Sequence, residues 1–101
     1  MDEMMLALNK YPNGTYIIVE WDEAKVMLGG VIETIYQTNN SLPVDAPSYQ
    51  EYYAVVFRLK DIMRNHGSST YKPNMVMELS MLTKPDRVKT ENGMLIWQAK
   101  A

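Results

Sequence analysis

The chain has 101 residues, 47% of them hydrophobic and 22% charged, and this composition fits one globular domain over residues 1–101. Its formal net charge of −2 gives no long-range attraction to nucleic acid or to an anionic membrane. Because the sequence contains no cysteine, it excludes disulfides, thiolate metal sites and thiol nucleophiles.

The first ten residues predict a short helix. Asp2 and Glu3 lie where negative charge stabilises a helix N-terminus, and Lys10 lies at the opposite end. Tyr11 precedes Pro12, which disfavours helical geometry and ends the element. The acidic start and its short apolar run differ from a secretory signal, so we expect a cytoplasmic protein.

Two extended segments follow the helix. Residues 15–21 are rich in β-branched and aromatic side chains, as strands prefer, and residues 26–36 continue this pattern. Gly29-Gly30 interrupts the second segment, and paired glycines inside a strand indicate a bulge or a sharp bend. The polar residues 37–48, with two prolines, predict a long exposed loop.

Residues 49–65 fit two different structures. Ser48 and Glu51 have the spacing of a helix capping box, and apolar residues then recur at intervals of three and four. Residues 52–57 form instead an apolar run of side chains that favour strands, and residues 58–60 alternate with a period of two. We favour the strand and keep the helix as the alternative.

The C-terminal third predicts a strand and a hairpin. Residues 75–82 alternate, which places Met75, Met77, Leu79 and Met81 on one face. Residues 87–91 and 94–98 flank Asn92-Gly93, a dipeptide typical of tight hairpin turns.

Together these elements predict a mostly β fold. Strand-length runs separated by turns, with a bend in the second, indicate a small SH3-like or Sm-like barrel. It would contain about five antiparallel strands and a short N-terminal helix. The alternative is an α+β fold in which residues 49–65 form a helix on one face of a sheet.

Residues with catalytic potential are few. His66 is the only histidine, and neither a metal-ligand spacing nor a catalytic partner accompanies it. Glu20, Asp22 and Glu23 cluster near the first turn, where apolar neighbours of Glu20 could raise its pKa for acid–base work. A surface-facing Glu20 is the simpler expectation. We predict no enzyme activity, no catalytic residue, no cofactor and no metal.

The aromatic residues favour a protein-interaction function. Tyr49, Tyr52 and Tyr53 stand beside the polar 37–48 loop, and three tyrosines so close together cannot all bury their hydroxyl groups easily. Tyrosine and methionine recur at interfaces, and an open sheet edge can pair with another strand. We predict a non-enzymatic module that binds another protein or itself as a homo-oligomer, with these tyrosines in the contact surface.

Binding of nucleic acid is the alternative function. In a strand, Tyr52, Arg58 and Lys60 share one face, as in small barrels that bind nucleic acids. However, 12 acidic residues outnumber 10 basic ones, and phosphate contacts need a clear basic cluster. Nucleic acid is therefore a less favoured partner, and no membrane partner is expected.

Overall fold

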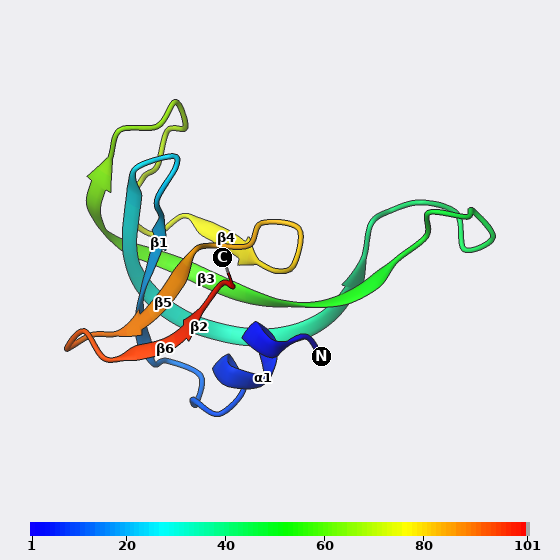
Figure 1. The fold of residues 1–101 in the computed structure, drawn as a ribbon, viewed down its shortest axis with the longest axis horizontal. Coiled ribbons are helices and arrows are strands. Elements are labelled where there is room, and N and C mark those ends of the chain that lie inside the picture. Colours follow the sequence, from blue (N-terminus) through cyan, green and yellow to red (C-terminus); the bar gives the residue numbers. More distant parts are fainter. Residues whose placement is uncertain (101) are drawn as a thin grey trace.

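The computed structural model describes residues 1–100, which form one short helix and six strands (Figure 1). Nothing helical in these residues is long or apolar enough to cross a membrane. The elements are α1 (Glu3–Leu8), β1 (Tyr16–Trp21), β2 (Val26–Asn39), β3 (Glu51–Asn65), β4 (Val76–Leu79), β5 (Arg87–Thr90) and β6 (Leu95–Gln98).

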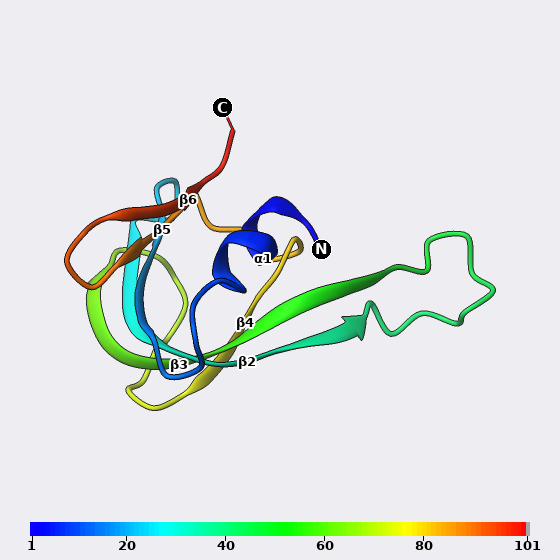
Figure 2. The same ribbon diagram turned by 90° about the horizontal axis from the view of Figure 1, so that it is seen from below.

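The strands form a single antiparallel sheet in the order β4-β3-β2-β1-β5-β6. The prediction of a mostly β fold with a short N-terminal helix is confirmed, with six strands rather than about five. Closure into an SH3-like or Sm-like barrel is not confirmed, because within residues 1–100 the edge strands β4 and β6 share no ladder. Helix α1 packs against both β6 and β3, and so fills the side on which the edges would have to meet (Figure 2).

The helix predicted as the alternative for residues 49–65 is wrong, since this segment is the long strand β3. Its large buried side chains follow a period of two, with Val55, Phe57 and Leu59 all in the core, and the small Ala54 is buried as well. Ile62 and Met63, which completed the helical stripe in the sequence, are exposed. The alternating pattern therefore decides the structure of this segment.

The core lies between the concave face of the sheet and α1. Asp2 caps this helix, because its side chain accepts a hydrogen bond of 2.9 Å from the backbone N–H of Met5. Met4, Met5 and Leu8 are fully buried against the sheet. The other members of the core are Ile17, Val19, Val26, Leu28, Ile32, Val55, Phe57, Leu59, Leu79 and Val88.

The predicted bend at the paired glycines is confirmed. The β2–β3 register shifts between Gly29 and Gly30, where a Cβ on Gly30 would lie 2.2 Å from the carbonyl oxygen of Arg58. A Cβ on Gly29 would lie 2.0 Å from the hydroxyl of Tyr16, which donates a 2.6 Å hydrogen bond to Asp61. Burial and this contact with Asp61 raise the pKa of Tyr16 to about 12.

Beyond this bend, β2 and β3 continue as a two-stranded ribbon that projects from the body (Figures 1 and 2). The pairing of β1 with β2 ends at Val31, and β4 pairs with β3 only over Val55–Arg58. We call residues 34–54 the arm. It gives the molecule extents of 43 × 31 × 30 Å.

We expect Gly30→Ala to destabilise the fold, because the added methyl group meets the backbone of β3 rather than a flexible side chain. Overpacking of this kind costs about 1–3 kcal/mol of unfolding free energy. Urea unfolding would measure the loss. Thr34→Ala, at an exposed position of the same strand, is the control and should change stability by less than about 0.5 kcal/mol. An unchanged midpoint for Gly30→Ala would contradict the steric argument.

Candidate functional site

The tip of the arm is ordered by its own hydrogen bonds. Asn40 is central, because its Nδ2 donates to the carbonyl of Ser48 at 2.7 Å and its backbone N–H donates to Gln50. Its Oδ1 accepts from the backbone N–H groups of Gln50 and Leu42. The exposed loop predicted over residues 37–48 lies at 40–50, because β2 extends to Asn39.

The three tyrosines predicted as the contact surface all lie on the arm, but they do not share one face. Successive strand residues point to opposite faces, so Tyr52 and Tyr53 are separated by the sheet. Tyr53 packs against the core, whereas Tyr52 lies on the other face. Tyr49 precedes β3 and is partly buried, and burial together with nearby Glu51 raises its pKa.

A shallow hollow of about 170 Å³ lies where the arm leaves the body. Four segments of the chain form it: the residues just before α1, each of the two strands of the arm, and the turn that follows β4. Met81 belongs to this turn and is exposed, because β4 ends at Leu79, whereas the sequence predicted a strand up to residue 82. The lining residues are Met1, Asp2, Gln37, Glu51, Tyr52, Tyr53 and Met81.

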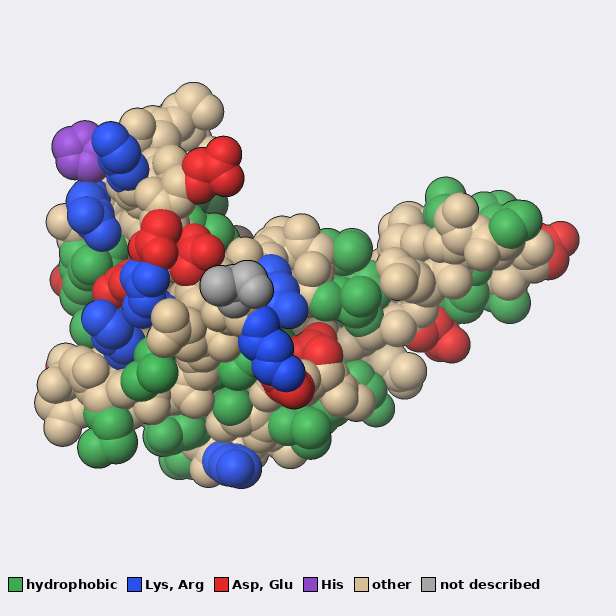
Figure 3. Space-filling view, viewed as in Figure 1, with side chains coloured by type: hydrophobic (Ala, Val, Ile, Leu, Met, Phe, Trp, Pro, Cys, Tyr) green, Lys and Arg blue, Asp and Glu red, His purple; other side chains and the backbone are tan. Residues whose placement is uncertain are grey.

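Charge is distributed unevenly between the arm and the body. Residues 26–57 contain no lysine, arginine or histidine but include Glu33, Asp45 and Glu51. Glu33 pairs with Arg58 at the root of the arm, whereas Asp45 and Glu51 form no ion pair within residues 1–100. Figure 3 shows Lys, Arg and His side chains over the body and none on the visible face of the arm. The arm is therefore uniformly acidic.

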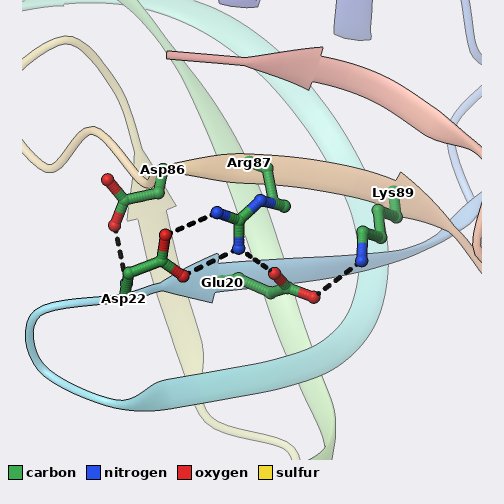
Figure 4. A network of polar contacts seen from close by, with 5 residues as sticks. All are labelled: Glu20, Asp22, Asp86, Arg87 and Lys89. Carbon is green, nitrogen blue, oxygen red and sulfur yellow. Dashed lines mark hydrogen bonds and ion pairs between the residues drawn. The ribbon is translucent and has the colours of Figure 1, made fainter. Parts of the chain in front are cut away.

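The carboxylate cluster near the first turn forms an ion network between β1 and β5 (Figure 4). Arg87 bonds to both Glu20 and Asp22, the latter at 2.7 Å, and Lys89 lies 3.1 Å from Glu20. Asp86 accepts a 2.6 Å hydrogen bond from the backbone N–H of Asp22. The network therefore links the end of β1 to the start of β5.

Glu20 differs from both expectations drawn from the sequence. It is only 4% exposed, so the prediction of a surface-facing side chain is wrong. Burial alone would raise its pKa, but the hydrogen bonds from Arg87 and Lys89 outweigh burial and lower it. A carboxylate held ionised by two cations is a poor proton donor near neutral pH, and Arg87 and Lys89 engage both of its oxygens.

The other sequence candidates do not assemble into a reactive site. His66 lies in an exposed segment, where its backbone N–H bonds to Lys25. In the described part of the chain, no three His, Asp or Glu side chains are grouped so as to hold a metal ion. Of the face predicted to bind nucleic acid, Arg58 is paired with Glu33 and Lys60 donates to Asn74, and nothing supports the nucleic-acid alternative.

Comparison with known families identifies the kind of protein. A family model described as "Cognate immunity protein YxxD" matches residues 1–101. The chain belongs to this family. No curated protein and no solved structure matches it. Immunity proteins act by binding a partner toxin, so the prediction of a protein-interaction function is confirmed at this level, while self-association stays a prediction.

The amino-acid composition marks the segment that forms the arm, although the hydrophobic periodicity does not. The 32 residues from Val26 to Phe57 lack any basic side chain, although basic residues make up 10 of the 101 in the chain. The hollow beside the arm has no local signal, because its residues come from four separate segments.

We expect the stability of this immunity protein to depend on Glu20 and on pH. Because folding lowers the pKa of Glu20, the ionised side chain stabilises the fold at pH values above its ordinary pKa of 4.5. This contribution is lost as the pH falls below 4.5 and through the lowered pKa of the folded state. Glu20→Gln should cost about 1–3 kcal/mol at pH 7, and the difference from the wild type should shrink towards pH 3.

Urea unfolding at several pH values would measure the unfolding free energy of the variant and of the wild type. Glu23→Gln is the matched control, since this carboxylate is exposed and lies in the turn of the same hairpin. A difference between Glu20→Gln and the wild type that stays constant from pH 7 to pH 3 would contradict the role assigned to ionised Glu20.

Proposed function

We propose that this immunity protein binds its cognate toxin through the arm, with Tyr49, Tyr52, Tyr53 and the tip loop in the contact surface. The observation that carries the proposal is the isolation of the arm, whose strands pair only with each other over most of its length. Two-stranded ribbons gain little stability on their own, so a projecting ribbon has no evident role in maintaining this fold.

The side chains of the arm are suited to an interface. Val44 at the tip is 79% exposed, and Leu42 beside it is also exposed. Partly buried tyrosines present a large apolar area with few rotatable bonds, and interface hot spots are rich in tyrosine. The proposal therefore combines an apolar tip with aromatic side chains behind it.

The hydrogen bonds around Asn40 favour tight binding. They order the tip in the free protein, so less conformational entropy is lost when the tip enters a complex. A narrow ordered projection can enter a concave surface, and occupying a toxin's functional cleft would neutralise it without any reaction. On this proposal the protein is an inhibitor and not an enzyme.

Self-association and a cytoplasmic location stay predictions beside this proposal. A second copy could use the same open strand edges. The molar mass in solution, measured by light scattering over a range of concentrations, decides whether free arms are available to a toxin.

We expect the double variant Tyr49→Ala/Tyr52→Ala to bind the toxin more weakly while retaining its fold. Loss of one hot-spot tyrosine alone raises Kd about 30-fold. Tyr53 is left in place because it packs against the core, and its removal would mix stability with binding. Calorimetric titration with the purified cognate toxin gives Kd, and survival of cells expressing the toxin gives protection.

The control is Met94→Ala/Leu95→Ala, which truncates two exposed apolar residues at the β5–β6 hairpin. Its Kd and its thermal midpoint should match those of the wild type. If the tyrosine variant binds as tightly as the wild type, the arm is not the contact surface. If the control alone loses binding, the interface lies at the opposite hairpin.

A further inference from the structure

The edge of β3 is open beside the end of β4. Leu59 donates its backbone N–H to Met75 and accepts from Asn74, so its peptide groups point towards the β4 side. From Leu59 back to Glu51, every residue of β3 has a partner on β2, without a bulge in β3. Every second residue therefore points to the same side, which places the N–H groups of Tyr53 and Glu51 at this edge.

No strand covers that edge within residues 1–100. The β3–β4 ladder stops at Val55 and Leu79, and residues 80–83 then form a turn in which Thr83 donates its backbone N–H to the carbonyl of Ser80. The opposite edge strand of the sheet, β6, is in a different environment, because α1 packs beside it. An extended segment laid along Glu51–Ala54 would continue the line of β4 and satisfy the open peptide groups of β3.

The hollow at the root of the arm adjoins this edge and has a defined chemistry. Asp2 and Glu51 bring two carboxylates to its lining, and no Lys, Arg or His side chain lines it. Tyr53 and Met81 supply apolar surface. An aliphatic stem with a positive head group, as in lysine or arginine, matches such a lining.

We propose that the toxin binds by strand addition. An extended segment of the toxin pairs with the edge of β3 over Glu51–Ala54 and places a Lys or Arg side chain in the hollow. This deepens the proposed function and rests on it, because it takes the toxin as the partner of the arm. Main-chain hydrogen bonds supply affinity in this mode, and the side-chain pocket supplies specificity.

Hydrogen exchange tests the strand addition directly. In the ¹⁵N-labelled protein, the amides of Glu51 and Tyr53 exchange quickly when free and should slow at least about tenfold at saturating toxin. The amide of Ile35 is the internal control, since by the same alternation it faces the other open edge of the arm, and Ile35 does not line the hollow. Complex formation with unchanged exchange at Glu51 and Tyr53 would overturn the proposal.

Two substitutions of Glu51 distinguish the contribution of its carboxylate to binding from that of its backbone N–H. Glu51→Gln removes the carboxylate and keeps the N–H, and should raise Kd about tenfold and weaken its salt dependence. Glu51→Pro also removes the backbone N–H at the open edge. The β2–β3 ladder does not use this N–H, so the variant should keep the arm and should raise Kd at least about tenfold further. Glu91→Gln, in the exposed β5–β6 turn, should leave Kd unchanged.

The outcomes distinguish this inference from the proposed function. If the wild type does not bind the toxin, the proposed function itself fails. If the tyrosine variant loses binding but Glu51→Pro binds as tightly as Glu51→Gln, the arm is the interface and strand addition is wrong. Circular dichroism checks the folding of Glu51→Pro, and if that variant unfolds, the exchange of the wild-type amides decides the question.

Discussion

At Gly30 the backbone of β2 comes so close to the carbonyl oxygen of Arg58 that a side chain has no space there. This contact lets β2 and β3 bend together, so that one half of each strand curls around the core and the other half leaves it. The concave face that holds α1 and the arm that projects away from it both follow from this bend. Two adjacent glycines thus separate a structural half of the hairpin from an exposed half.

The electrostatics follow the same division. In the body, Arg87 and Lys89 hold buried Glu20, and Arg58 holds Glu33 where the arm begins. These pairs stabilise the packed half of the hairpin and its neighbours. Within residues 1–100, Asp45 and Glu51 on the arm form no ion pair, so their charge is available to a basic surface. Complementary charge chiefly accelerates association and selects the partner, which suits a protein that must find one toxin.

Local pattern predicted much of the fold, and long-range contacts explain what it missed. Asn92-Gly93 forms the expected hairpin turn, with Gly93 at a φ of 90°, and alternation correctly favoured a strand for β3. The open sheet could not be predicted, because α1 meets β6 from the other end of the sequence. Burial of Glu20 was also missed, since Arg87 lies 67 residues away. The sequence placed the three tyrosines beside the polar loop, but it predicted neither the arm nor which face of it each tyrosine would occupy.

The position of Tyr53 links stability to binding in a way that its neighbours do not. Its ring packs on the core at the root of the arm and also lines the hollow, so the same side chain holds the ribbon to the body and shapes the proposed pocket. Tyr36 anchors the other face of the ribbon through its hydroxyl, which donates to Glu78 on β4. Because the root is fixed on both faces and Asn40 orders the tip, the arm is held at both ends. An open edge on a ribbon held in this way is already extended, so a partner strand can pair with it without first ordering it.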